Sequence, residues 1–194
     1  MSLQASVVEA VESLPRVRRV TLAGSRADGR EHPSSDWDFA VETDDFGVTR
    51  DELPGPLEPL RPLAAQWDRL SENECFMLIL PGPVKVDLIF AEEPHRAEPP
   101  WSPDAGNLPS IDRHFWDWML WLAGKAAARK ASLVADELTK LSQHLLRPLG
   151  APGVPASIPD AVAVYRAARE EAERRFDVRV PRFLEAEVAP ALPS

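Results

Sequence analysis

The segment from residue 17 to residue 43 restricts the fold of this chain more than any other part of the sequence. Val17–Ala23 predicts a strand, a Gly-Ser dipeptide follows it, and Trp37–Thr43 predicts a second strand. Successive side chains of a strand point to opposite faces, so Asp36 and Asp38 share one face and the apolar residues of the second strand share the other. The fold must therefore contain a sheet with a buried apolar face and an opposite face that carries two carboxylates.

A third carboxylate is predicted on a later strand. Cys75–Leu80 and Val84–Ala91 predict two further strands, joined by a Pro-Gly-Pro turn. Four apolar side chains of the later strand share one face, and Lys85, Asp87 and Ile89 share the other. Asp87 therefore interrupts an otherwise apolar strand on the face that carries polar chemistry.

These residue types fit the binding of a nucleoside triphosphate with magnesium. Gly24 allows the backbone to approach phosphate closely, Ser25 adds a hydroxyl donor, and the cation of Arg26 can neutralise phosphate charge. Carboxylates such as those of Asp36 and Asp38 are the hard oxygen ligands that Mg²⁺ prefers. Two such ions can polarise an α-phosphate, activate an attacking hydroxyl and support a departing pyrophosphate. Asp87 is then expected to bind the ion nearer the acceptor, or to accept the acceptor's proton.

The remaining pattern predicts an α/β fold in two parts. We expect a helix over residues 3–14, a loop over 44–56 and a helix over Leu57–Leu70. A Pro-rich connector over 96–109 divides the chain into a domain of residues 1–95 and a helical domain of residues 110–194. The helices expected in the second part are Asp112–Arg129, Ser132–Leu146 and Pro159–Phe176. Lys125 follows the aromatic half of the first of these by one turn and is a candidate contact for a triphosphate.

The charge of the chain is concentrated in its first half. Residues 1–95 hold 9 Lys and Arg against 18 Asp and Glu, whereas residues 96–194 hold 13 of each. This excess argues against a nucleic-acid polymer as partner, which needs a basic track, and it suits a cationic small molecule. We expect neither a membrane span nor a secretory leader, and the single Cys75 favours a cytoplasmic protein.

The order of these motifs resembles that of the polymerase-β-like nucleotidyltransferase superfamily. The resemblance lies in Gly24-Ser25, the pair Asp36-x-Asp38 and the later Asp87, and it covers residues 16–91. The start Gly-Ser-Arg-Ala and the small size look like the bacterial small-molecule branch, which includes aminoglycoside and lincosamide nucleotidyltransferases. The resemblance implies a mixed sheet flanked by helices, a C-terminal helical bundle, Mg²⁺-ATP as donor and metal binding by the three aspartates.

The expected activity is therefore transfer of AMP from ATP to a hydroxyl of a small molecule, with an aminoglycoside-like antibiotic as one candidate acceptor. Two alternatives stay open. The first is AMPylation of a protein, as in antitoxin-type minimal nucleotidyltransferases, and the helical second half argues against it. The second is an inactive nucleotide-binding interaction module. The sequence leaves the acceptor, the base preference and the oligomeric state open.

Overall fold

The structure, a computed structural model, describes residues 2–32 and 35–193. The chain separates into two compact units, an N-terminal unit that ends at Glu98 and a C-terminal unit that starts at Pro99. Within the described residues, no helix combines the length and apolar character that crossing a bilayer requires.

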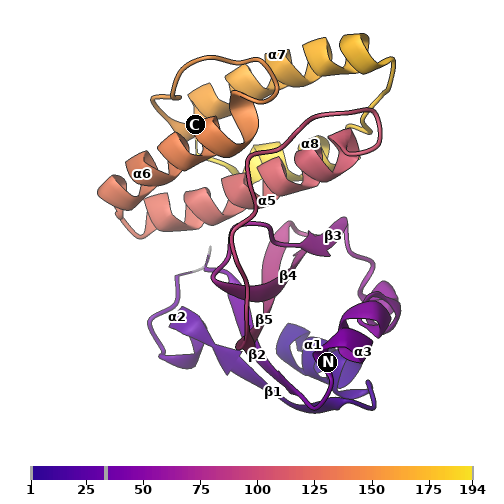
Figure 1. Cartoon of the computed structure of the whole chain (residues 1–194). Coiled ribbons are helices and arrows are strands. Elements are labelled where there is room, and N and C mark those ends of the chain that lie inside the picture. Colours follow the sequence, from indigo (N-terminus) through magenta and orange to yellow (C-terminus); the bar gives the residue numbers. More distant parts are fainter. Residues whose placement is uncertain (1, 33–34, 194) are drawn as a thin grey trace. The chain divides into compact units, whose positions relative to one another are not determined.

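A mixed sheet forms the centre of the N-terminal unit (Figure 1). Its described strands are β1 (Val17–Ala23), β2 (Trp37–Thr43), β3 (Ala64–Trp67), β4 (Asn73–Leu80) and β5 (Val84–Pro94). They lie in the order β1-β2-β5-β4-β3. Of the strand pairs described, β2 and β5 alone run parallel, and the other three are antiparallel. The strands predicted from the sequence are confirmed, and β3 is an addition to them.

One face of this sheet holds the hydrophobic core. Alternate residues of the strands, including Phe39 and Leu88, point to this face and are fully buried. Helix α1 (Leu3–Glu12) covers it with Val7 and Val11 and begins at Ser2, whose hydroxyl accepts a hydrogen bond from the Ala5 amide at 3.2 Å. Burial of this apolar face leaves the opposite face of β2 and β5 for polar side chains, as the strand alternation predicts.

Two sequence predictions in the N-terminal unit are wrong. The expected loop over 44–56 contains helix α3 (Phe46–Glu52), which Asp45 caps by accepting from the Val48 amide at 3.1 Å, and the short helix α4 (Pro54–Leu57). The expected helix over Leu57–Leu70 is a 3₁₀ turn, η1 (Glu58–Leu60), followed by strand β3. Arg61 takes a left-handed conformation and Pro62 disfavours helix before it, so the helical spacing of the apolar residues there is coincidental.

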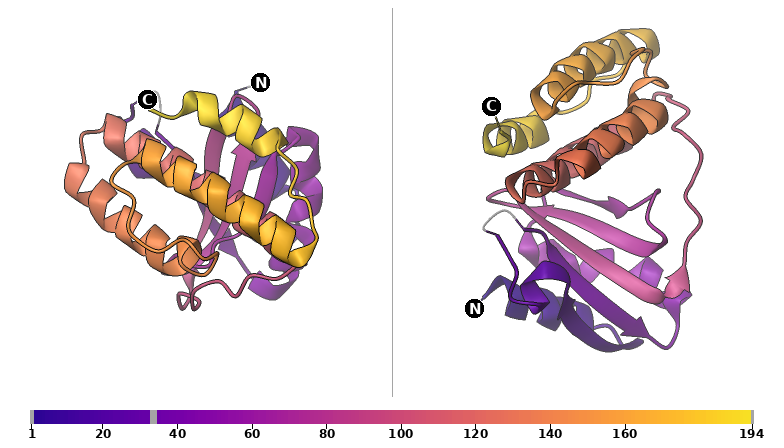
Figure 2. Two further views of the ribbon diagram at one scale, coloured as in Figure 1. Left: turned by 90° about the horizontal axis from the view of Figure 1, so that it is seen from above. Right: turned by 90° about the vertical axis from the view of Figure 1, so that its left-hand side faces the viewer.

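The C-terminal unit is helical, as predicted. Its elements are α5 (Leu108–Ala127), α6 (Ala131–Leu141), the π-helical turn η2 (Ser142–Leu146), α7 (Ile158–Phe176), α8 (Phe183–Val188) and the 3₁₀ turn η3 (Ala189–Ala191) (Figures 1 and 2). Phe115, Trp116 and Trp118 of α5 are buried, and the ring of Phe115 stacks on Tyr165 of α7 at a centroid distance of 3.7 Å. The aromatic stripe of α5 is therefore helix packing within this unit.

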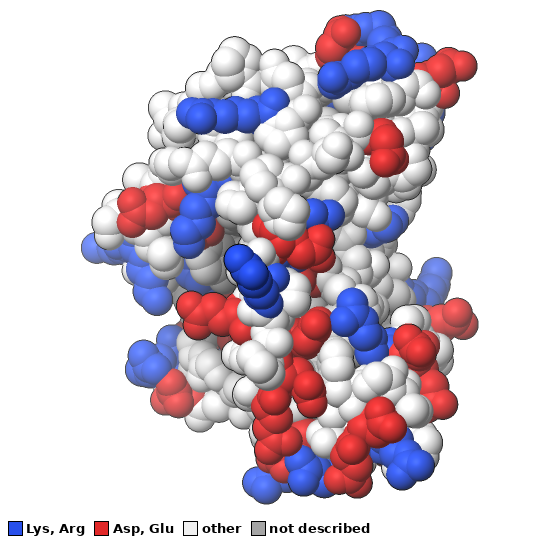
Figure 3. Space-filling view, viewed as in Figure 1, with Lys and Arg blue, Asp and Glu red and all other residues white. Residues whose placement is uncertain are grey.

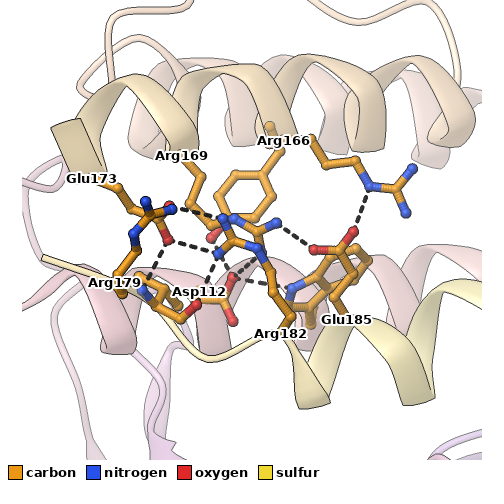
Figure 4. A network of polar contacts seen from close by, with 10 residues as sticks. Asp112, Arg166, Arg169, Glu173, Arg179, Arg182 and Glu185 are labelled. Atoms are coloured by element: carbon orange, nitrogen blue, oxygen red, sulfur yellow. Dashed lines mark hydrogen bonds and ion pairs between the residues drawn. The ribbon is translucent and has the colours of Figure 1, made fainter.

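A buried polar network joins α5, α7 and α8 (Figure 4). Oδ1 of Asp112 accepts from Tyr165 at 2.7 Å, from Arg169 at 2.9 Å and from the indole of Trp116 at 3.2 Å. The other end of the Arg169 guanidinium pairs with Glu185 of α8. Burial raises the pKa of Asp112, and its three donors act in the opposite direction. The network fixes the short helix α8 to the two long helices.

Candidate active site

The parallel pairing of β2 and β5 places two of the predicted carboxylates side by side. Asp38 and Asp87 are direct partners in the register of these strands. Asp36 directly precedes β2, is 7% exposed, and contributes electrostatically to the environment of Asp87. Asp38 and Asp87 therefore lie side by side on two neighbouring strands, and Asp36 directly precedes the first of these strands.

Gly24 lies against this site at the end of β1. It opens the short helix α2 (Gly24–Ala27) with a φ of +63°, which an L side chain rarely adopts. A Cβ at this position would stand 2.0 Å from Oδ2 of Asp38 and 2.9 Å from its Cγ. Glycine is thus required here both for its conformation and for the close approach of the backbone to a site carboxylate.

We expect Gly24→Ala to destabilise the protein more than Gly29→Ala. Both glycines have a φ of +63°, but a Cβ at Gly29 meets no atom within 4 Å. Gly29→Ala should cost about 1–2 kcal/mol from backbone strain alone. Gly24→Ala adds displacement of Asp38, so its loss should be larger by at least ~1 kcal/mol. Urea unfolding of both variants measures the difference, and equal losses would show that the contact with Asp38 is not formed.

Arg26 makes contacts that the sequence did not predict. Its guanidinium donates to the carbonyl oxygen of Ser35 at 2.7 Å and to that of Asp36 at 3.0 Å, and it lies 4.1 Å from the ring centroid of Trp37. These contacts tie α2 to the backbone that carries the first two aspartates. Ser25 follows Gly24 in α2 and is half-buried. The phosphate contacts expected of Ser25 and Arg26 remain predictions, and the structure gives Arg26 a positioning role.

Two further charged residues near Asp87 were missed as site residues. Nζ of Lys85 lies 2.7 Å from Oδ1 of Asp87, and the lysine side chain is 6% exposed. Asp68 follows β3, and its Oδ1 accepts from the Leu70 amide at 2.9 Å. Burial raises the pKa of Asp87, the Lys85 ammonium opposes this, and Asp36 and Asp68 raise the pKa further. The position of Lys85 beside Asp87 on one strand face was the available signal, whereas Asp68 depended on the unpredicted β3.

The carboxylates match the chemistry of a magnesium site, although they are not gathered as a finished one. Among the described residues, no group of three or more His, Cys, Asp or Glu side chains stands close enough to hold a metal ion. The donor set of Asp36, Asp38 and Asp87 is nevertheless all hard oxygen, on adjacent strands, with the Gly24 backbone against one member. These residues therefore fit a divalent cation, with Asp87 paired to Lys85 as described.

Lys125, the remaining predicted site residue, belongs to the C-terminal unit. It lies in the last turn of α5, with Nζ 4.9 Å from the ring centroid of Trp121. Its contact with a nucleotide stays a prediction.

Acidic side chains are spread over the visible face of the N-terminal unit, with Lys and Arg among them, in the lower part of Figure 3. The excess of 18 Asp and Glu over 9 Lys and Arg in residues 1–95 is thus largely a surface property. A negative field of this kind attracts cations toward this unit.

A comparison with protein-family models identifies the class of the N-terminal unit. Residues 5–99 match the family model described as nucleotidyltransferase domain. A comparison with curated protein sequences gives no match. Among solved structures, an aminoglycoside 6-adenyltransferase from Bacillus subtilis is 12% identical with a TM-score of 0.36, over 94% of this chain and 93% of that one. The polymerase core of TRAMP, a RNA surveillance complex, is 12% identical with a TM-score of 0.39, over 88% of this chain and 55% of that one.

The N-terminal unit is therefore a nucleotidyltransferase domain, as the family match over residues 5–99 shows. The match to this domain supports nucleotidyl transfer as the activity of the chain.

Proposed function

We propose that this enzyme transfers AMP from ATP to a hydroxyl group of a small, positively charged acceptor, and that it depends on Mg²⁺. The observation that carries the proposal is the direct pairing of Asp38 with Asp87 on parallel strands, with the glycine turn at Gly24 against Asp38. Paired carboxylates beside a backbone turn are the arrangement that nucleotidyl transfer needs, because both metal and phosphate must lie there.

The reaction makes one bond and breaks one. The acceptor hydroxyl oxygen bonds to the α-phosphorus of ATP, and the bond from that phosphorus to the bridging oxygen breaks. Pyrophosphate leaves with the electron pair. We assign the hydroxyl proton to the carboxylate of Asp87, which lies beside Asp38 in the strand register.

Asp36, Asp38 and Asp87 are the residues that would hold Mg²⁺. When bound, the ion supplies charge neutralisation at the α-phosphate and at the departing pyrophosphate. Gly24 and Ser25 are assigned to the phosphates, and Arg26 keeps the backbone of Asp36 in place through its carbonyl contacts. An acceptor bearing amines, such as an aminoglycoside-like antibiotic, is favoured by the acidic surface of the N-terminal unit.

Purified protein with ATP, Mg²⁺ and a panel of hydroxyl acceptors tests the proposal. Pyrophosphate release together with an acceptor that gains the mass of an AMP group is the expected result, and it should vanish with a chelator. The panel should pair each cationic acceptor with a neutral one of similar size. Labelling of protein alone would favour AMPylation, and tight ATP binding without any turnover would favour a nucleotide-binding module. The same assay with GTP, CTP or UTP in place of ATP shows which nucleotide is the preferred donor.

Lys125→Ala tests the contact assigned to that lysine. Loss of one charge-assisted hydrogen bond to the triphosphate should raise the KM for ATP roughly 10- to 100-fold. Lys130→Ala is the control, since Lys130 lies at the N-cap of α6 and is exposed. A KM for ATP that is unchanged in Lys125→Ala would remove this residue from the nucleotide site.

A further inference from the structure

Lys85 is an unusual residue in the site because its charged side chain is almost fully buried. It is 6% exposed, and its Nζ forms an ion pair of 2.7 Å with Oδ1 of Asp87. A lysine is rarely buried to this extent unless a carboxylate pairs with it, since desolvation of an ammonium is costly. The role of Lys85 must therefore be understood together with the acidic residues around it.

The strand register places Lys85 at the level of the first carboxylate. Trp37 pairs with Val86, and Asp38 pairs with Asp87, in the parallel register of β2 and β5. Asp36 and Lys85 each precede the Trp37–Val86 pair by one residue. The ammonium thus belongs to the same stretch of the sheet face as the carboxylates of Asp36, Asp38 and Asp87, and its charge offsets part of theirs.

Oδ1 of Asp87 cannot accept a full-strength hydrogen bond from Lys85 and at the same time coordinate a metal ion. Nζ of Lys85 donates a hydrogen bond to Oδ1 of Asp87. The negative charges of Asp36 and Asp68 also act on this carboxylate and raise its pKa. A divalent cation that binds these carboxylates brings two positive charges to a place where one is already present. Repulsion between the cation and the ammonium is expected, because charges a few ångströms apart in a part-buried site are weakly screened.

We propose that Lys85 is a positioning residue that serves as an internal counter-cation: it holds Asp87 while no nucleotide is bound and competes with the divalent cation for that carboxylate. The proposal rests on the assignment of the three aspartates to metal binding in the proposed function. The ammonium of Lys85 offsets part of the negative charge of the partly buried acidic side chains beside it. It also makes metal affinity in the absence of nucleotide weaker than the carboxylates alone would give.

Substitution of Lys85 by Met in the full chain tests the proposal without any turnover. In EDTA, Lys85→Met should lower the Tm by about 10 °C, because it leaves buried carboxylates without their cation. Added Mn²⁺ should raise the Tm of the variant by several degrees more than that of wild type. Titration of free Mn²⁺ by electron paramagnetic resonance should show roughly tenfold tighter binding to the variant.

Two companion variants keep the result interpretable. Lys140→Met removes a lysine that pairs with Glu137 at 2.5 Å in the C-terminal unit, and it should change neither the metal-dependent Tm shift nor Mn²⁺ affinity. The double variant Lys85→Met/Asp87→Asn should regain part of the Tm lost in EDTA, since both members of the pair are neutral. If Lys85→Met alone does not fold, the Tm of the double variant is compared with that of wild type instead.

The proposal is overturned if wild type and Lys85→Met bind Mn²⁺ equally, or if the ion stabilises both by the same amount. It is also overturned if the double variant is less stable in EDTA than Lys85→Met. These measurements are separate from the acceptor assay. Failure to find an acceptor would leave the linkage between Lys85 and Mn²⁺ intact, and active enzyme without that linkage would overturn only the role of Lys85.

Discussion

Replacement of Asp38 by Asn should reduce the proposed AMP transfer by at least about 10²–10³-fold while the protein stays folded. The amide has nearly the same shape as the carboxylate, so it preserves the packing of Asp38 against the Gly24 turn. It carries no charge and is a poor ligand for a hard cation. The loss is measured as kcat/KM for ATP at saturating acceptor, beside a urea unfolding curve of each protein.

The matched control for this substitution is Asp51→Asn. Asp51 lies on α3, is exposed, and is not part of the pairing between β2 and β5, so it undergoes the same chemical change outside the candidate site. Its activity should equal that of wild type. Asp87→Asn should be impaired to a similar degree as Asp38→Asn, and the double variant should lose little more, because residues of one site act as a unit. Full activity in Asp38→Asn would refute the site.

Arg169→Met should destabilise the C-terminal unit by about 3–5 kcal/mol. The guanidinium is 3% exposed and links Asp112, itself 4% exposed, to Glu185. Methionine fills much of the same volume but leaves the buried carboxylate of Asp112 without its cation. Thermal unfolding measures the loss, and hydrogen exchange should rise first in α8, since Glu185 then retains only its ion pair with Arg166 among the pairs described.

Arg174→Met is the control on the same helix. Arg174 pairs with Glu171, and both side chains are more than 60% exposed, at 66% and 62%. An exposed pair of this kind contributes at most about 0.5 kcal/mol, so this variant should unfold almost as wild type does. Similar losses in Arg169→Met and Arg174→Met would mean that the buried network contributes no more than a surface pair.

The sequence predicts the strands of the N-terminal unit well because their alternation is regular. It also predicts that Asp36, Asp38 and Asp87 face away from the core. It does not reveal that β2 and β5 are neighbours, since strand order depends on the packing of segments far apart in the chain. The helix expected over Leu57–Leu70 fails for a related reason: pairing with β4 outweighs a spacing of apolar residues that also fits a helix.

Contacts of single charged side chains are harder still to predict. The strand pattern places Lys85 and Asp87 on one face, and the folded structure shows that they form an ion pair of 2.7 Å. The sequence predicts that Arg26 contacts phosphate, and in the structure its guanidinium donates hydrogen bonds to backbone carbonyl oxygens. The buried network of Asp112 and Arg169 has no sequence signal, because its members lie on helices that come together only in the folded unit.

The apolar face of the sheet, opposite the candidate site, determines the register of β2 against β5. Phe39 and Leu88 are partners in that register, and both are fully buried in the core. Insertion of one residue within β5 would exchange the two faces and turn Asp87 toward the apolar side. Insertions in the turns between strands leave the facing intact. A change in the spacing of apolar residues inside these two strands would therefore displace the candidate site carboxylates, whereas a change in loop length would not.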